Sequence, residues 1–234
     1  MGSFPTRAVI FDLDDTLMDD AACTRAGLAA LADEYGMGQD WPPEQLFQRH
    51  AEIIRAAEPL LFRGLLSVHE ARSLRYQRLL GELGVRNVDG GAATRTYRAA
   101  YRAAWTEVEG AGEVVRVLKG RGLRVGVLTN YVRDLQAQKL DFLGLTPLVD
   151  ALLCAADPDV PAPKPDPRSY LAACAALRVH PSEAVMVGDS WENDVQGARE
   201  AGLRAVWLNR TGEQAPDPAV PTVRHLAELP SLLE

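Results

Sequence analysis

Residues 8–16 read Ala-Val-Ile-Phe-Asp-Leu-Asp-Asp-Thr, an apolar run that ends in a dense acidic patch. The apolar part predicts a short strand, and open α/β sheets bind ligands at the carboxyl ends of their parallel strands. Side chains alternate along a strand, so Asp12 and Asp14 are expected to project from the same side. Two carboxylates about 4 Å apart repel by about 4 kcal/mol at an effective dielectric near 20, so the patch favours a cation or a shared proton. Alone, it would also suit a polar turn or a helix cap.

The composition is that of a globular protein. With 234 residues, 47% of them hydrophobic and 24% charged, the chain can bury one good-sized core with room for a second, small domain. The net charge of -7 argues against a nucleic-acid partner, because there is no basic surplus to displace counterions. No apolar run reaches the eighteen or so residues of a membrane helix, and the N-terminus lacks the features of a signal peptide. We therefore expect a cytoplasmic protein with no membrane partner.

Cysteine and histidine give no metal-binding pattern. The three cysteines form no Cys-x-x-Cys pair, so we expect reduced, buried thiols. The four histidines are scattered, and none has the spacing of metal ligands. Surface or packing roles are expected for all four.

After residue 110 the chain alternates between helix-like and strand-like segments, which indicates parallel βα units. The strands are short apolar runs, as expected when both faces of a sheet are covered. We predict a Rossmann-like α/β fold with three layers, α/β/α, around a parallel sheet. The expected helices cover residues 113–121, 134–143, 168–177 and 194–201, and the expected strands cover 8–11, 123–128, 151–154, 184–187 and 204–208.

Residues 20–104 differ in character from the rest and look entirely helical. The expected helices cover 21–35, 43–57, 67–83 and 91–104. An insertion of this size after the first strand suggests a separate helical lid. We therefore predict a discontinuous core domain, 1–19 and 105–234, interrupted by a helical cap domain, 20–104.

Three further polar groups follow predicted strands. Thr129 and Asn130 offer a hydroxyl and an amide that can donate to phosphate oxygens. Lys164 lies between two prolines and supplies a localised positive charge. Asp189 and Asp194 follow Gly188 with a spacing of five. Each group alone would be read as a turn, a helix cap or a solvated loop.

Together, in this order, these residues resemble the motifs of the haloacid dehalogenase superfamily. Its members carry an Asp-x-Asp motif, a Thr or Ser after the second strand, a Lys, and a Gly-Asp-x-x-x-x-Asp motif. The resemblance implies that Asp12 is the nucleophile, which attacks phosphorus and forms an aspartyl-phosphate. It implies that Asp14 is the general acid and base, which protonates the departing alcohol and then deprotonates the hydrolytic water.

The same resemblance implies a Mg²⁺ site. The ligands would be Asp12, the backbone carbonyl of Asp14, and Asp189, with Asp194 assisting through a metal-bound water or through Lys164. Oxygen ligands of this kind suit that ion.

The remaining motif residues would surround the phosphoryl group. The resemblance implies that Thr129, the backbone N–H of Asn130 and Lys164 stabilise charge on its equatorial oxygens. Thr16 would order the loop. Asp15, Asp19 and Asp20 are interpreted as loop or capping acids.

Within the family, phosphate-ester hydrolysis is favoured over the other reactions. Dehalogenases generally lack an acid at the position of Asp14, and phosphonate cleavage needs a cap lysine, which residues 20–104 lack. A phosphosugar mutase and a catalytically silent binding protein on the same fold stay open as alternatives. A receiver domain is excluded, because it is about half this length and has no helical insertion.

The helical insertion resembles the first cap type of the family, which admits small metabolites. We therefore expect a small phosphorylated metabolite as the substrate, and a monomer or homodimer as the assembly. Several cap arginines are candidates for contact with the substrate, although most are expected to be solvated: Arg49, Arg55, Arg63, Arg72, Arg75 and Arg78.

Overall fold

The computed structural model describes residues 5–37, 41–155 and 157–233. It divides into two compact units. The core unit consists of Met1–Asp19 and Glu107–Glu234, and the helical unit consists of Asp20–Thr106. Within the described residues, no helix is both long enough and apolar enough to cross a membrane.

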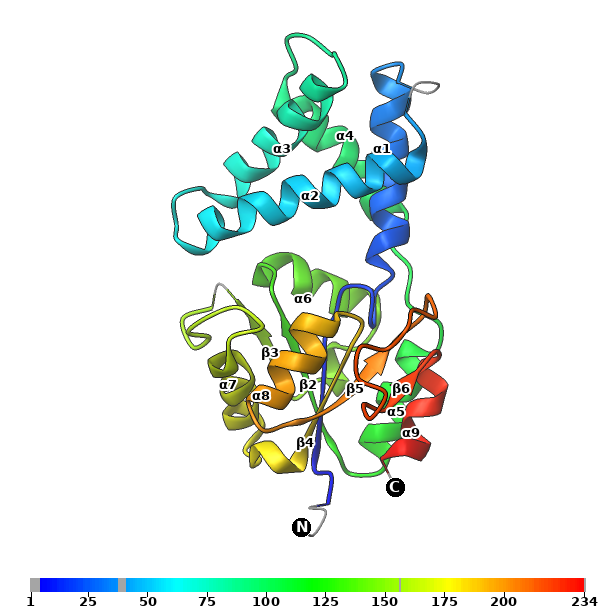
Figure 1. Ribbon diagram of the computed structural model, residues 1–234, viewed down its shortest axis with the longest axis vertical. Coiled ribbons are helices and arrows are strands. Elements are labelled where there is room, and N and C mark those ends of the chain that lie inside the picture. Colours follow the sequence, from blue (N-terminus) through cyan, green and yellow to red (C-terminus); the bar gives the residue numbers. More distant parts are fainter. Residues whose placement is uncertain (1–4, 38–40, 156, 234) are drawn as a thin grey trace. The chain divides into compact units, whose positions relative to one another are not determined.

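The core unit is built on a parallel six-stranded sheet with the strand order β3-β2-β1-β4-β5-β6. Figure 1 labels β2 to β6 of this sheet together with the helices of the core unit. β1 lies in the middle, and the chain builds the sheet to one side through β2 and β3, then to the other side from β4. This reversal makes the carboxyl end of β1 the place where a crevice opens in an α/β sheet. The strands are β1 (Ala8–Phe11), β2 (Arg124–Thr129), β3 (Ala151–Cys154), β4 (Ala184–Gly188), β5 (Arg204–Leu208) and β6 (Thr222–Val223).

Helices cover both faces of this sheet. α7 packs on β2 and β3 and against α8, whereas α5 packs on β2 and against α9. The predicted three-layer fold with a parallel sheet is therefore confirmed. The helices are α5 (Ala111–Gly120), α6 (Arg133–Phe142), α7 (Pro167–Leu177), α8 (Gly197–Glu200) and α9 (Leu229–Leu232), with short helical turns at Thr146–Leu148, Pro181–Glu183 and Leu226–Glu228.

The burial of β1 explains its uninterrupted apolar sequence. All four of its residues are fully buried, because layers on both sides enclose them. Ala8 and Ile10 belong to one hydrophobic cluster with Tyr170 and Leu177 of α7. By strand alternation, Val9 and Phe11 face the opposite layer. The end of β1 is therefore held rigidly from both sides.

Two parts of the core unit differ from the predicted elements. Asp194 lies in a wide helical turn, Trp191–Gln196, that precedes α8, so the helical segment expected from Asp194 begins earlier, at Trp191. β6 and α9 were not predicted. β6 has only two residues, which is too short for an alternating pattern to be visible.

The helical unit contains α1 (Asp20–Glu34), α2 (Pro43–Phe62), α3 (Val68–Glu82) and α4 (Gly90–Ala103). α4 packs against α1 and α3, and α2 packs against α1 and α3. Ser67 and Glu70 form a capping box at the start of α3, and Asp89 caps α4. A stack of rings fills the interior of the unit, with centroids 4.9 Å to 5.8 Å apart: His50, Tyr76, Tyr97 and Tyr101.

Candidate active site

Asp12 is the first residue after β1, and its position follows from the register of the sheet. Its backbone N–H donates to the carbonyl oxygen of Val187 at 2.9 Å, which continues the pairing of β1 with β4. The residue is only 8% exposed. One carboxylate oxygen, Oδ1, accepts a hydrogen bond from Nζ of Lys164 at 2.7 Å. The chain thus places a buried carboxylate at the carboxyl end of β1, in the middle of the sheet.

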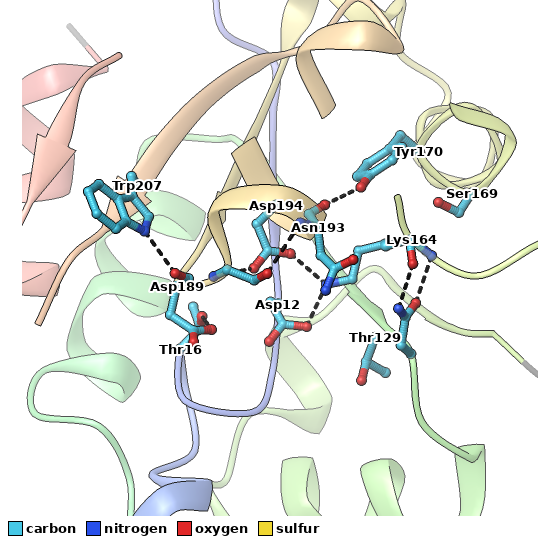
Figure 2. A network of polar contacts seen from close by, with 12 residues as sticks. Asp12, Thr16, Thr129, Lys164, Ser169, Tyr170, Asp189, Asn193, Asp194 and Trp207 are labelled. Atoms are coloured by element: carbon cyan, nitrogen blue, oxygen red, sulfur yellow. Dashed lines mark hydrogen bonds and ion pairs between the residues drawn. The ribbon is translucent and has the colours of Figure 1, made fainter. Parts of the chain in front are cut away.

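Lys164 bridges two carboxylates. Its Nζ lies 2.7 Å from Asp12 and 2.6 Å from Asp194, and all three side chains are buried (Figure 2). Burial by itself lowers the pKa of Lys164, but the two carboxylates outweigh it and raise that pKa above its ordinary value. Lys164 is therefore a fixed cation beside the candidate nucleophile.

Asn130 holds the backbone of Lys164. Its Nδ2 donates to the carbonyl oxygen of Lys164 at 2.8 Å, and its Oδ1 accepts from the Lys164 N–H at 2.7 Å. The side chain of Asn130 is thus used to position the lysine. The backbone N–H of Asn130 is the group to which the resemblance assigns a role in phosphate binding.

The two acids of the last motif are held differently. Asp194 accepts from Lys164 through Oδ1 and from the Ser190 N–H at 3.0 Å through Oδ2, so both of its oxygens are engaged within the protein. Among the described side chains, the hydroxyl of Thr16 donates a long hydrogen bond, 3.3 Å, to the carboxylate of Asp189. Its backbone carbonyl accepts from the indole of Trp207 at 2.7 Å, which fixes the main chain but not the carboxylate (Figure 2). Asp189 is thus the acid whose carboxylate is less committed to the protein.

These acids form a cluster suited to a divalent cation. One oxygen each from Asp12, Asp189 and Asp194 lie within 4.8 Å of one another. Lys164 offsets only part of their charge. Burial, together with the neighbouring acids, raises the pKa of Asp12 well above its ordinary value and raises the pKa of Asp189 to about 7. A hard cation would relieve this repulsion, and carboxylate oxygens are the ligands that Mg²⁺ prefers, so the donor set fits Mg²⁺.

Asp14 lies in a different environment from that expected by strand alternation. β1 ends at Phe11, so the alternation of side chains does not continue as far as Asp14. Its carboxylate is bonded to two side chains of α6. Gln136 Nε2 donates to Oδ2 at 2.9 Å, and Lys139 Nζ donates to Oδ1. The carboxylates of Asp12 and Asp14 are therefore oriented by different parts of the core unit.

The sequence reasoning missed Gln136 and Lys139. Both lie in the predicted helix 134–143, and no motif spacing points to either of them. Their spacing of three places them on one face of α6 together with Leu140, and this face is buried. A lysine and a glutamine on the apolar face of a short helix were the signal that could have identified them.

The two threonines of the motifs are both buried. Thr129 is the last residue of β2 and is buried, and its Oγ1 accepts from Gln136 Nε2 at 2.8 Å. Thr16 is fully buried in the loop after β1 and contacts Asp189. The structure thus gathers the sequence-predicted residues at one edge of the sheet.

Comparisons with known proteins agree with this arrangement. A family model for haloacid dehalogenase-like hydrolases matches residues 6–202. The chain is 32% identical to a phosphoserine phosphatase of Thermus thermophilus, over 93% of this chain and 94% of that protein. It is 34% identical to a ribulose-1,5-bisphosphate 5-phosphatase of Halopiger xanaduensis, over 88% of this chain and 86% of that protein.

Solved structures show the same fold. The HAD-hydrolase YfnB of Bacillus subtilis superposes with a TM-score of 0.77 at 23% identity, over 99% of this chain and all of that chain. A 2-haloacid dehalogenase of Pseudomonas syringae superposes with a TM-score of 0.66 at 26% identity, over 97% of this chain and 98% of that chain. The extent of the family match and the named relatives lead to one conclusion: the chain belongs to the haloacid dehalogenase-like hydrolases and is a phosphatase-like member of that family.

Proposed function

We propose that this protein is a Mg²⁺-dependent phosphohydrolase that cleaves small-molecule phosphate monoesters through an aspartyl-phosphate on Asp12. One observation carries the proposal: the buried Asp12 carboxylate contacts the Lys164 ammonium inside a cluster with Asp189 and Asp194. A carboxylate attacks an anionic phosphate only where positive charge offsets the repulsion. This site combines the nucleophile, a fixed cation and the ligands for a second cation.

Each step of the proposed reaction is assigned to a residue of the chain. Asp12 attacks phosphorus, the bond from phosphorus to the ester oxygen breaks, and Asp14 gives a proton to the departing oxygen. Asp14 then takes a proton from the water that hydrolyses the acyl phosphate, which returns both carboxyl groups to their starting forms. Lys164, Thr129 and the N–H of Asn130 stabilise the charge on the equatorial oxygens.

The acidic cluster and the family motif support a set of metal ligands. Asp12, Asp189 and the backbone carbonyl of Asp14 would hold Mg²⁺. Asp194, whose two oxygens already accept hydrogen bonds, would assist through Lys164. When bound, Mg²⁺ offsets the negative charge shared by the carboxylates and the phosphate.

A dehalogenase activity is the main competing function, because some proteins of this fold are dehalogenases. Halide displacement releases an anion that needs no proton. Asp14 argues against it, since the chain places at this position a carboxylate that is 29% exposed and supported by two donors. Phosphoryl transfer to an alcohol or to water uses such a group. A phosphosugar mutase would use the same residues and is distinguished by its product.

We further propose that 1–19 and 105–234 form the catalytic core and that the helical segment 20–104 serves as its cap. The support is the position of the insertion in the sequence, directly after the first acidic motif. Small phosphorylated metabolites are the proposed substrates. Phosphoserine and ribulose 1,5-bisphosphate are the first to test, because similar proteins are named for them. A cytoplasmic location stays part of this proposal.

The test is release of inorganic phosphate from a panel of esters, with Mg²⁺ and with EDTA. The panel contains p-nitrophenyl phosphate, phosphoserine, ribulose 1,5-bisphosphate, phosphoglycolate, nucleotides and sugar phosphates. We expect turnover that EDTA abolishes and that Asp12→Asn lacks. Asp217→Asn, which changes an exposed acid of the core unit, serves as the control and should keep full activity. Turnover by Asp12→Asn at the wild-type rate would exclude the covalent mechanism.

A further inference from the structure

Two buried polar side chains of α6 contact the carboxylate of Asp14. Lys139 donates to Oδ1 of Asp14, and Gln136 donates to Oδ2 at 2.9 Å. Each oxygen of this carboxylate thus has its own donor, and both donors come from one face of one helix. Two contacts on different oxygens fix the plane of a carboxylate, whereas a single contact would let it rotate.

Lys139 is enclosed behind Asp14. The side chain of Lys139 is 1% exposed, whereas that of Asp14 is 29% exposed. A buried ammonium is costly unless a carboxylate pairs with it, so this arrangement ties the ammonium to Asp14. A substrate can therefore reach the carboxylate of Asp14 but not the nitrogen of Lys139. Through this contact, Lys139 acts on the reaction by way of Asp14.

The composition of the chain sets this lysine apart. The chain has 22 arginines and only three lysines: Lys119, Lys139 and Lys164. Surface cations are thus nearly always arginine here, yet two of the three lysines are buried at the site. A lysine ammonium is a compact point charge, whereas a planar guanidinium would engage a carboxylate through two parallel hydrogen bonds.

Gln136 connects Asp14 to the phosphate-binding strand end. Its Nε2 has two hydrogens and makes two contacts, to Oδ2 of Asp14 and to Oγ1 of Thr129 at 2.8 Å. Its Oε1 is buried and has no hydrogen-bond partner among the described residues. A buried acceptor without a partner destabilises the fold, so the two hydrogen bonds that Nε2 donates are what favours a glutamine at this position.

We propose that Lys139 and Gln136 are positioning residues that set the orientation of Asp14 relative to the phosphoryl site. This inference rests on the proposed function, in which Asp14 handles the proton. Lys139 fixes one oxygen of Asp14, and Gln136 ties the other to Thr129. The acid and base group is thereby aligned with the group that contacts the phosphate. Effective proton transfer depends on such alignment.

The test separates the proton-dependent step from the rest of the reaction. The ratio kcat/KM reports the steps up to formation of the aspartyl-phosphate, and an activated ester such as p-nitrophenyl phosphate needs no proton there. We expect Lys139→Met to lower kcat/KM for the best alkyl ester by about tenfold or more and for p-nitrophenyl phosphate by less than about threefold. During turnover of p-nitrophenyl phosphate, Lys139→Met should also increase the fraction of enzyme trapped as the aspartyl-phosphate, because Asp14 then activates water more slowly. Lys119→Met is the matched control. It removes a lysine of α5 whose Nζ lies 2.7 Å from Asp150.

A double-mutant cycle tests whether Lys139 acts through Asp14. If it does, Lys139→Met should add less than a twofold loss in an Asp14→Asn background, because the two changes remove one shared function. Gln136→Met should give the same pattern and serves if Lys139→Met does not fold. Equal losses for the activated and alkyl esters, or fully additive losses in the cycle, would overturn the inference. A wild-type protein that cleaves no ester would instead count against the proposed function itself.

Discussion

The side chain of Asn130 and the backbone of Lys164 are joined by two hydrogen bonds of opposite direction, 2.8 Å and 2.7 Å long. This pair connects the residue after β2 to the loop before α7, although 34 positions separate them. The ammonium of the same lysine bridges Asp12 and Asp194. The asparagine therefore sets the position of the cation through the backbone of Lys164.

Asn130→Ala should lower kcat/KM by about tenfold, because two hydrogen bonds worth about 1 kcal/mol each no longer hold the Lys164 backbone. The backbone N–H of residue 130 is kept, so the loss reports on Lys164. Phosphate release measures it. Gln138→Ala, on the exposed face of α6, is the control and should keep the wild-type rate. An active Asn130→Ala enzyme with unchanged kcat/KM would show that the lysine needs no such support.

Gly188→Ala should displace Asp194. A Cβ at Gly188 would lie 2.2 Å from Oδ2 and 2.3 Å from Cγ of Asp194, closer than any real contact. Asp194 must then give up its bond to Lys164 or to Ser190. We expect a loss of about 1–3 kcal/mol in stability and a large loss of activity. Thermal unfolding and phosphate release check this.

Gly120→Ala is the matched control for this substitution. Gly120 ends α5, and a Cβ there would meet nothing within 4 Å. This variant should be neutral or slightly more stable. If Gly188→Ala behaved in the same way, the close packing of Asp194 against the strand would be unimportant for the site.

The candidate residues were predictable where the signal was local and repeated. Buried apolar runs marked β1, β2 and β4, and the polar residues directly after them marked the sheet edge, because parallel strands bring their carboxyl ends together. Lys164 was identified through its family motif, and the same resemblance linked it to Asp194. Its contacts with Asp12 and Asn130 were not predicted, since a loop lysine has no periodicity that points to either.

The surroundings of Asp14 were not predictable in this way. The alternation argument assumed that the strand continued to Asp14, but β1 ends at Phe11 and the chain turns. Gln136 and Lys139 lie more than 120 positions away from Asp14, and only the packing of α6 brings them to it. A pattern read within one element cannot supply a contact between two elements.

His50 should make the helical unit sensitive to acid. Burial, and then the neighbouring Arg75, lower the pKa of His50 from 6.5 to about 3. Between these pH values the unfolded chain binds a proton that the folded unit excludes, so stability is lost as the pH falls below about 6.5. The loss approaches about 1.4 kcal/mol per pH unit.

His50→Phe should flatten this dependence, because phenylalanine keeps a ring for the stack with Tyr76 and Tyr97 but does not titrate. Hydrogen exchange of α2 amides between pH 4.5 and 7 measures it, after correction for the intrinsic exchange rate. His69→Phe, which changes an exposed histidine, should retain the wild-type dependence. Equal pH dependence in His50→Phe and wild type would mean that His50 is protonated in the folded unit.

Asp189 should make the metal-free core less stable as the pH rises, which is the opposite of the effect of His50. Burial, and then Asp194, raise the pKa of Asp189 from 3.8 to about 7, so the folded protein keeps a proton that the unfolded chain releases near pH 4. This stabilising contribution is complete below about pH 4 and is lost as the pH rises through about 7. A cation at the cluster competes with that proton, so Mg²⁺ should raise the Tm more at pH 8 than at pH 5.5.

Asp189→Asn should remove most of this difference, because an amide neither titrates at these pH values nor repels Asp194. Thermal unfolding in EDTA and in Mg²⁺, at pH 5.5 and pH 8, measures four values of Tm for each protein. Asp217→Asn, an exposed acid paired with Arg199, should behave like the wild type. A Mg²⁺-induced shift in Tm that is equal at both pH values in the wild type, or unchanged in Asp189→Asn, would exclude Asp189 as the acid where proton and metal compete.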